Sequence, residues 1–471
     1  METVASNKTR TFPVPEIVAD QRAYFQTGAT LNVEFRIAQL KKLKSAIEQY
    51  EHQILEALKQ DLNRDHTSGY LLEVGFILNE LDETLRHIRK WTKPKRVPTP
   101  LFHAKAKSYI KSDPYGVTLI IAPWNYPFQL SVGPLIGAMA AGNTAVIKPS
   151  EISPNTSAVI AQMFNEHFDP KYIAVVEGGI PESKALLDEK FDYIFYTGST
   201  VVGKLVYQSA AKHLTPVTLE LGGKSPCIVD NKTHLEYTAK RIVWGKLVNA
   251  GQTCIAPDYL LVHNDIKDKL IEEMRKQIKA MYSEDPSKSD EYGRIISEKH
   301  FKRISALMDK DKIVVGGKVD AYDRYIEPTI MEGVNDDDPV MQEEIFGPVL
   351  PVMTYENIEE VITYINKHPK PLALYVFSKN QGTIDKVIGE TSSGGVCVND
   401  TLMHIGTPHL PFGGVGDSGI GAYHGQSSFD TFSHKKSIMH KSFLLDMPIR
   451  YTPYTAKASK MLRTLLKYTN R

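Results

Sequence analysis

The chain has 471 residues, 42% of them hydrophobic and 24% charged, and its 56 Lys and Arg residues nearly balance its 55 Asp and Glu residues. This length exceeds one compact core and predicts two or three domains, while the mixture of apolar and charged residues excludes a disordered chain. The net charge of +1 excludes a nucleic-acid binder that relies on overall charge.

The first hundred residues are predicted to be helical. Apolar side chains recur every three or four residues from Leu40 to Leu58, which is the spacing of one face of an amphipathic helix. In the segment His103–Ser112, small or apolar residues alternate with basic ones, so we expect an exposed strand there. Such a strand promotes aggregation unless it is paired, and a partner subunit is one means of pairing it.

From about residue 116, short β-type runs alternate with helix-length segments. The predicted strands are Val117–Ala122, Thr144–Ile147, Ile173–Val176 and Tyr193–Tyr196. This alternation predicts βαβ units and a parallel sheet that is buried on both faces. The pattern returns later, with strands at Leu260–Val262 and Ile313–Val315 on either side of a helix at Lys267–Met281. A second α/β domain is therefore predicted to begin near Gly222.

Two reactive side chains stand out near the start of this second domain. Cys254 follows Gly251 in a loop (NAGQTCIAP), where a thiolate can act as a nucleophile. Glu220 lies between an apolar run and two glycines, and desolvation there would raise its pKa towards that of a general base. The alternatives are a small buried cysteine and a turn-capping carboxylate. Cys227 and Cys397 lie in apolar runs and are expected in the core, and the cysteine spacing matches no metal site.

Three further segments carry polar side chains or glycines at predicted strand ends. Asn125, in PWNYP, can donate to an oxyanion, although it is also an ordinary turn residue. The segment Gly198–Gly203 (GSTVVG) follows a strand and opens a helix, a context that can bind pyrophosphate. Lys148 and Glu151 (KPSE) can hold ribose hydroxyl groups, although a surface lysine and a helix-start glutamate have the same pattern.

Taken together, these motifs resemble those of the aldehyde dehydrogenase superfamily. The segments PWNYP, KPSE, TGSTVVG, LELGGKSP, NAGQTC, EEIFGPV and PFGGVGDSG occur in family order across roughly residues 110–425. The interval of 34 residues between Glu220 and Cys254 also fits the family. The short N-terminus, CIAPDYLL and HLPFGG resemble the class 3 branch, which includes fatty-aldehyde dehydrogenases.

The resemblance implies NAD(P)-dependent oxidation of a medium-chain, long-chain or otherwise apolar aldehyde to its carboxylic acid. Cys254 would attack the carbonyl carbon and carry first a thiohemiacetal and then a thioester. The Asn125 side chain and the Cys254 backbone N–H would hold the oxyanion, and Glu220 would activate the hydrolytic water.

The resemblance also implies NAD as the cofactor, with NADP as an alternative. The residues implied in binding it are Trp124, Lys148, Glu151, Gly198, Ser199, Gly203, Glu344 and Phe346. Lys148 and Glu151 would hold the adenine ribose, Glu344 would hold the nicotinamide ribose, and Phe346 would pack near the nicotinamide ring.

The fold implied by the resemblance is α/β, with a Rossmann-like cofactor domain, an α/β catalytic domain and a small β bridging (oligomerisation) element. We expect the cofactor domain at 1–102 and 114–221, the catalytic domain at 222–425, the bridging element at 103–113 and 426–450, and a C-terminal segment at 451–471. Resemblance to the class 3 branch suggests a homodimer.

The C-terminal segment 451–471 has the pattern of a basic amphipathic helix. Its apolar residues are Met461, Leu462, Leu465 and Leu466, and its basic residues are Lys457, Lys460, Arg463, Lys467 and Arg471. Such a helix can pack on its own subunit or across a dimer. The alternatives are peripheral contact with a membrane and a cover over the substrate entrance.

The localisation follows from three sequence features. Three cysteines cannot form a disulfide framework and indicate a reducing compartment. Residues 1–13 are polar, unlike a signal peptide, and the apolar stretches are shorter than the roughly 18–20 residues that span a bilayer. We expect a cytoplasmic protein, and the C-terminal segment is the part that would contact a membrane if that segment does not pack on the protein itself.

Two rival functions remain open from the sequence. A cysteine hydrolase would need no nicotinamide and would pair Cys254 with a histidine such as His404, His409 or His424, but it leaves GSTVVG and KPSE unexplained. A CoA-acylating relative would release the acyl group to a thiol, whereas the presence of Glu220 favours release to water.

Overall fold

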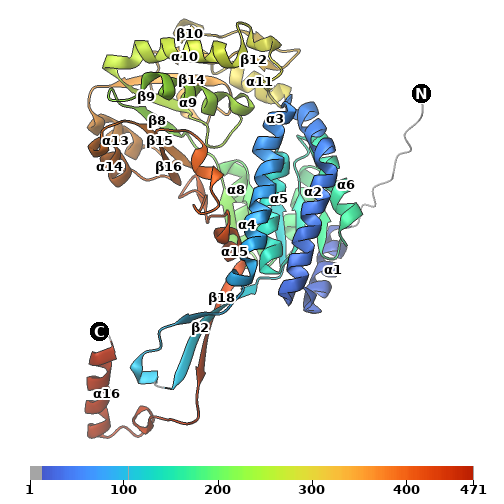
Figure 1. Cartoon of the computed structure of the whole chain (residues 1–471), viewed down its shortest axis with the longest axis vertical. Coiled ribbons are helices and arrows are strands. Elements are labelled where there is room, and N and C mark those ends of the chain that lie inside the picture. Colours follow the sequence, from blue (N-terminus) through green and yellow to red (C-terminus); the bar gives the residue numbers. More distant parts are fainter. Residues whose placement is uncertain (1–12, 104, 470–471) are drawn as a thin grey trace, which may run out of the picture.

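A computed structural model describes residues 13–103 and 105–469 of the chain. Two α/β lobes lie against each other, and a narrow tail extends from the first lobe and ends in helix α16 (Figure 1). Within these residues, no helix is both long enough and apolar enough to cross a lipid bilayer.

The first lobe is built on sheet I, whose strands lie in the order β17-β7-β6-β3-β4-β5. They are β3 (Val117–Ile121), β4 (Thr144–Lys148), β5 (Ile173–Val175), β6 (Tyr193–Thr197), β7 (Val217–Glu220) and β17 (Gly419–Ile420). All pairs are parallel except β17–β7, so the four strands predicted here are confirmed. Leu119 and Ile120 of β3 enter different cores, as expected for a sheet covered on both faces.

Helices cover both faces of sheet I. On one face lie α1 (Val14–Gln26), α7 (Ile180–Asp188) and α8 (Thr200–Ala211); on the other lie α5 (Pro127–Ala141) and α6 (Pro154–His167). The helices α2 (Val33–Leu62) and α4 (Gly75–Trp91) pack outside α5 and α6. The helix predicted around Leu40–Leu58 is confirmed as part of α2, and its apolar face is buried. Between α2 and α4 lie the short α3 (His66–Gly69) and a π-helical turn, η2 (Tyr70–Val74).

The second lobe is built on sheet II, in the order β10-β13-β14-β9-β8-β15-β16. Its strands are β8 (Pro226–Val229), β9 (Tyr259–His263), β10 (Ile313–Val315), β13 (Thr329–Glu332), β14 (Val349–Tyr355), β15 (Ala373–Phe377) and β16 (Gly395–Val398). A small hairpin pairs β11 (Val319–Asp320) with β12 (Tyr325–Ile326). The helices of this lobe are α9 (Leu235–Leu247), α10 (Lys267–Tyr282), α11 (Glu298–Ser305), α12 (Pro339–Gln342), α13 (Ile358–Lys367) and α14 (Gln381–Glu390).

The tail contains a three-stranded antiparallel sheet, here called the tail sheet. It is formed by β1 (Lys95–Val97), β2 (Ala106–Pro114) and β18 (Ser433–Lys441). The strand predicted near His103–Ser112 is therefore β2, and the chain itself pairs it on both sides. After β18 the chain reaches α16 (Ala456–Thr469), which packs against the short turns at 101–103 and 448–450.

Sheet membership departs from the expected domain boundaries in three places. β1 belongs to the tail sheet although it precedes residue 103, and β17 joins sheet I although it lies before residue 425. The helix α15 (Gln426–Thr431), expected in the bridging element, packs on α5 of the first lobe. The physical reason is that short segments at a boundary follow whichever hydrogen-bonding edge or apolar face lies next to them.

Candidate active site

Cys254 lies in a strained loop at the boundary between the lobes. The loop follows a short turn at Val248–Gly251, in which Asn249 and Ala250 have φ of 54° and 50°. Left-handed conformations of this kind are uncommon outside glycine and concentrate at functional sites. Gly251 has φ of 75°, and a Cβ there would lie 2.2 Å from the carbonyl oxygen of Gly347. The backbone at this position therefore requires glycine.

The Cys254 side chain is half-buried and has acidic neighbours. Burial raises the pKa of its thiol, and the carboxyl groups of Glu344 and Glu220 raise this pKa further. The backbone N–H groups of Cys254 and Ile255 hydrogen-bond the sulfur and act in the opposite direction. The electrostatic influence of both carboxyl groups shows that three of the predicted site residues lie in one neighbourhood.

Glu220 is the last residue of β7 and is 2% exposed. Its backbone carbonyl accepts the Gly198 N–H at 3.0 Å, but in the described part of the chain neither carboxyl oxygen has a hydrogen-bond partner. Burial raises the pKa of this carboxyl well above its usual value. The rise in pKa expected from the sequence is thus present. A buried carboxyl group without partners is costly to the fold, which indicates a functional requirement for it.

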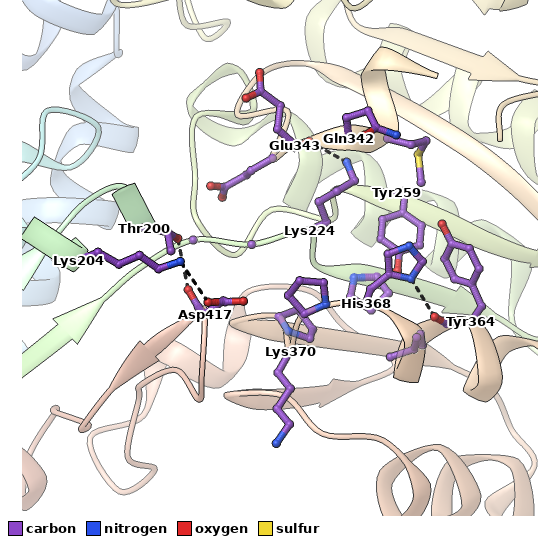
Figure 2. A pocket seen from close by; sticks show the side chains of 18 residues that line it. Thr200, Lys204, Lys224, Tyr259, Gln342, Glu343, Tyr364, His368, Lys370 and Asp417 are labelled. Carbon is purple, nitrogen blue, oxygen red and sulfur yellow. Dashed lines mark hydrogen bonds and ion pairs between the residues drawn. The ribbon is translucent and has the colours of Figure 1, made fainter. Parts of the chain in front are cut away.

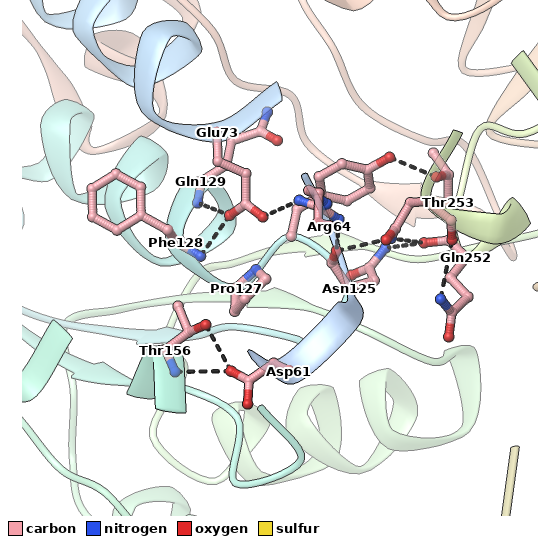
Figure 3. Close-up of polar contacts among 12 residues, drawn as sticks. Asp61, Arg64, Glu73, Asn125, Pro127, Phe128, Gln129, Thr156, Gln252 and Thr253 are labelled. Atoms are coloured by element: carbon pink, nitrogen blue, oxygen red, sulfur yellow. Dashed lines mark hydrogen bonds and ion pairs between the residues drawn. The ribbon is translucent and has the colours of Figure 1, made fainter. Parts of the chain in front are cut away.

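Asn125 follows β3 in the loop that leads to α5, and it is 3% exposed. Its side-chain Nδ2 donates to the Gln252 carbonyl at 3.0 Å, two residues before Cys254 in the chain (Figure 3). The Asn249 side chain donates to the carbonyls of Asn125 and Gln252 at 3.0 and 3.1 Å. These bonds join the PWNYP loop of the first lobe to the cysteine loop of the second.

Comparison with known proteins agrees with this geometry. The sequence model of the aldehyde dehydrogenase family matches residues 4–438. The chain belongs to the aldehyde dehydrogenase family. It is 51% identical over 440 residues to the 4,4'-diaponeurosporen-aldehyde dehydrogenase of Staphylococcus aureus, covering 93% of this chain and 96% of that protein. It is 48% identical to the dimeric NADP-preferring aldehyde dehydrogenase of Rattus norvegicus, covering 94% and 98%.

Solved structures of aldehyde dehydrogenases share the fold. The substrate-bound state of Staphylococcus aureus AldH matches with a TM-score of 0.94 and 49% identity, covering 96% of this chain and 99% of that one. An indole-3-acetaldehyde dehydrogenase complexed with NAD+ matches with a TM-score of 0.82 and 28% identity, covering 91% and 89%. This aldehyde dehydrogenase therefore has a Rossmann-like domain and a catalytic domain and oxidises aldehydes with NAD(P).

The glycine-rich segment of this aldehyde dehydrogenase suits a pyrophosphate. Gly198 and Ser199 join β6 to α8, and Ser199 caps the helix by accepting the Val202 N–H. A Cβ at Gly203 would lie 2.6 Å from Cδ2 of Leu221, so glycine allows α8 to pack closely on the sheet. The free N–H groups at the start of this 12-residue helix can bind a phosphate.

Lys148 and Glu151 form an ion pair where β4 ends. Lys148 is 2% exposed, and its Nζ lies 2.8 Å from Glu151 Oε2. Burial alone would raise the pKa of Glu151, but the hydrogen bond from Lys148, a backbone hydrogen bond and the charge of Lys148 together outweigh burial and lower this pKa. The ionised carboxylate can accept a hydrogen bond from a ribose hydroxyl, and the fixed ammonium group beside it can donate one.

A cleft of about 330 Å³ opens between the lobes near the start of α8. Thr200 and Lys204 line it from the first lobe, and Lys224 and Glu343 from the second (Figure 2). Glu344, which also lines the cleft, is half-buried, and its desolvation together with the charge of Asp258 raises its pKa to about 8.

Glycine makes room for Glu344 in this cleft. A Cβ on Gly222 would lie 2.1 Å from Glu344 Oε2. The rings of Trp124 and Phe346, both predicted cofactor residues, lie 5.3 Å apart at 81° and bring together loops of the two lobes. A helix end for the pyrophosphate, carboxylates for the riboses and a glycine-walled cleft together fit a nicotinamide dinucleotide.

Several residues of the site carry no prediction from the sequence. Lys224 donates to Asp258 Oδ2 at 2.6 Å and to two carbonyls of the loop that presents Glu344, so it supports that loop. Lys224 lies inside LELGGKSP and Asp258 inside CIAPDYLL, so these motifs already indicated that both residues belong near the site. Arg64 and Glu73, next to Asn125, lie in the N-terminal helical region, where the periodicity indicates only packing.

Proposed function

We propose that this aldehyde dehydrogenase oxidises apolar aldehydes by covalent catalysis at Cys254, with Asn125 and Glu220 as its partners. The observation that carries the proposal is Glu220, whose buried carboxyl oxygens have no partner in the described part of the chain, within electrostatic reach of the Cys254 thiol. A carboxylate placed in this way is available to a water molecule that attacks the acyl carbon.

The proposed reaction begins with attack of the Cys254 thiolate on the aldehyde carbon. The oxyanion of the thiohemiacetal is held by the second N–H of the Asn125 amide and by the Cys254 backbone N–H. The chemistry that NAD(P)+ supplies when bound is acceptance of the hydride, whose departure leaves a thioester on Cys254. Glu220 then removes a proton from water, which attacks the thioester and regenerates the thiol.

The proposed cofactor contacts divide between the lobes. Lys148 and Glu151 hold the adenine ribose, and Glu344 holds the nicotinamide ribose beside Phe346. The pyrophosphate binds at the segment Gly198–Gly203, and the Trp124 ring lies beside that of Phe346. We propose NAD as the preferred cofactor because the ionised Glu151 repels a 2′-phosphate, although three relatives are named NADP-preferring.

Analysis of the products tests the reaction. We expect carboxylic acid to form only when NAD(P)+ is present, and to remain the product when free CoA is added. Product formation without a nicotinamide would favour a cysteine hydrolase, and release of acyl-CoA would favour an acylating relative. Intact-protein mass spectrometry of the Glu220→Gln variant should show an acyl group on the enzyme, since hydrolysis of the thioester is blocked.

An apolar substrate is supported by the names of relatives. One is named for 4,4'-diaponeurosporen-aldehyde, and the chain resembles the branch that contains fatty-aldehyde enzymes. Each methylene buried on binding contributes about 0.8 kcal/mol, so four additional methylenes contribute about 3 kcal/mol. KM should therefore fall steeply from short to long aliphatic aldehydes. A KM that is flat across chain length would contradict this substrate class.

We propose that the end of the tail contacts the anionic surface of a membrane from the cytoplasm. Residues 93–114 and 433–471 contain 15 Lys and Arg residues and 2 Asp residues, which gives this part of the chain a net charge of +13. Because the whole chain has a net charge of +1, the remaining residues have a net charge of −12. Phe443 and Leu444 at the tail end are 106% and 89% exposed, and Met461 of α16 is also exposed. Exposed apolar side chains among basic ones suit an anionic lipid surface.

We also propose a homodimer that forms through the tail sheet. The inner edge of β18 pairs with β2, and in the described chain no strand pairs with its outer edge. An open edge of nine residues can pair with another chain. Three relatives are named dimeric, which supports the same assembly here.

A further inference from the structure

A buried ion pair lies next to the oxyanion loop and has no part in the reaction described so far. Arg64 follows α2, Glu73 lies in the π-helical turn η2, and their side chains are 3% and 0% exposed. Burying two charges is costly, and such a pair persists only where further hydrogen bonds satisfy both groups. π-helical turns are rare in proteins, and those that occur are often found at functional sites. The burial and position of this ion pair therefore indicate a role in addition to helix packing.

Glu73 holds the start of α5. Its Oε2 accepts the backbone N–H groups of Phe128 and Gln129 at 2.8 and 3.0 Å, while Oε1 accepts the Arg64 guanidinium (Figure 3). A carboxylate at this place satisfies two free N–H groups of the first turn and complements the helix dipole. Since α5 begins at Pro127, the last residue of PWNYP, Glu73 fixes the end of the loop that carries Asn125.

Arg64 holds the other side of the same loop. Its Nη2 donates to the backbone carbonyl of Asn125 at 2.8 Å, and its guanidinium lies over the Tyr126 ring, 4.6 Å from the ring centre. The planar guanidinium can bind Glu73 and Asn125 at once because its N–H groups diverge in fixed directions. The ion pair thus connects the helix start and the Asn125 backbone through one rigid group.

The Asn125 side chain depends on this backbone for its direction. An amide has two N–H donors, and one of them is used by the Gln252 carbonyl at 3.0 Å. The second N–H is the one available to an oxyanion. Because Nδ2 is anchored to Gln252 and the backbone to Arg64, a shift at either anchor turns the free N–H away from its target.

We propose that Arg64 and Glu73 are positioning residues that set the oxyanion-binding geometry of Asn125, although neither touches the aldehyde. The proposal rests on the proposed function, in which Asn125 is an oxyanion donor. A misplacement of roughly 1 Å by a distant change can cost about 10² in rate. The loss should appear in the acylation step, whereas the affinity for the dinucleotide should be unaffected.

The first measurement is the burst of NADH in the pre-steady state at saturating NAD+. The Glu73→Gln variant cannot accept all three hydrogen bonds as a carboxylate does, so its burst rate constant should fall by about 10- to 100-fold. Its dissociation constant for NADH, measured by fluorescence, should stay within about twofold of the wild-type value. A burst rate constant within twofold of wild type would overturn the proposal.

A double-mutant cycle shows whether the effect passes through Asn125. In the Asn125→Ala background, adding Glu73→Gln should slow the burst by less than about twofold, because the group being positioned is absent. Effects that multiply would overturn the proposal while leaving the role of Asn125 intact. If Asn125→Ala alone leaves the burst unchanged, the oxyanion role itself fails, and the positioning role fails with it.

The chain supplies a matched control for loss of a buried capping carboxylate. Asp61 ends the same helix α2, is 4% exposed, and caps α6 by accepting the Thr156 N–H at 2.8 Å, without contacting Asn125 (Figure 3). Asp61→Asn should leave the burst rate near wild type; an equal slowing would overturn the proposal. If Glu73→Gln fails to fold, the double variant Arg64→Met/Glu73→Gln removes both charges of the pair. A burst rate constant of this double variant within twofold of wild type would likewise overturn the proposal.

Discussion

Cys254 is the side chain on which the proposed chemistry depends most directly. Cys254→Ala should abolish aldehyde oxidation, because no other thiol lies beside Glu220 and Glu344. Dissociation constants for NADH should stay near wild type, since the thiol forms a bond to the substrate rather than to the dinucleotide. Cys227→Ala and Cys397→Ala are the controls, with one cysteine buried and the other half-buried in sheet II. Loss of activity in either control with an active Cys254→Ala would reassign the nucleophile.

Glu220 predicts a pH dependence with a definite sign. Burial raises the pKa of this carboxyl, and only its ionised form can take a proton from water. Decay of the acyl-enzyme should therefore accelerate as pH rises through the raised pKa, and should be lost as pH falls below it. Stopped-flow decay of the acyl-enzyme against pH measures this limb. Glu220→Gln should lack the limb, and persistence of the limb in that variant would assign it to another group.

Glu151 predicts the choice of cofactor. Its pKa is lowered, so it is ionised at neutral pH and repels a 2′-phosphate on the adenine ribose. Glu151→Gln should raise kcat/KM with NADP+ relative to NAD+ by about tenfold, which is about 1.4 kcal/mol. Initial rates with both cofactors give this ratio. The control is Glu166→Gln, at the surface of α6; the idea fails if both variants change the ratio alike.

The sequence predicted the residues of the site unequally. Cys254, Glu220 and Asn125 lie in motifs that contain glycine or proline. Each residue alone also has an ordinary structural interpretation, and the set of motifs in family order selected them. Arg64 and Glu73 acquire their roles from contacts 61 and 55 residues away along the chain, with Asn125 and Phe128. Periodicity reports only which face of a helix is buried, and it cannot report which distant loop a buried charge meets.

At the scale of elements, the tail end gives a direct test of membrane contact. A chain ending at Tyr451 lacks α16 and should bind phosphatidylserine vesicles at least tenfold more weakly than the full chain in a sedimentation assay. Binding of the full chain should fall as salt screens the basic residues. Vesicles of neutral lipid are the control. Equal binding by both chains would show that α16 has no role in membrane contact. Loss of the dimer on truncation would show instead that α16 packs against the partner subunit.

The regular elements of both lobes were largely predictable, because strands buried on both faces have continuous apolar runs and the helices between them are amphipathic. The pairing of distant strands was harder to predict from the sequence. The sequence marked the segment around β2 as an exposed strand, but β18 lies more than three hundred residues later and its pairing with β2 was inferred from the family resemblance. The π-helical turn η2 had no local signal, since one additional residue in a turn leaves apolar periodicity almost unchanged.

At the scale of the whole molecule, the open edge of β18 predicts the oligomeric state. Mass photometry should give about 105.6 kDa, twice the chain mass of 52.8 kDa. The backbone N–H groups of neighbouring strand residues point to opposite edges of the strand. Proline has no N–H, so one of the two variants Ile438→Pro and Met439→Pro removes a donor from the open edge of β18 and leaves the bonds to β2 intact. That variant should be a monomer with a nearly unchanged melting temperature. If the folded variants both remain dimeric, the subunits associate elsewhere.

The tail sheet and the oxyanion loop share one uninterrupted stretch of backbone. β2 ends at Pro114, two residues link it to β3, and β3 ends three residues before Trp124 and four before Asn125. A strand of nine residues is about 30 Å long, so β2 carries this backbone about 30 Å away from the link containing Gly116. A surface or a second subunit that bound the tail would therefore be connected to the loop that carries Asn125 through two strands and a two-residue link.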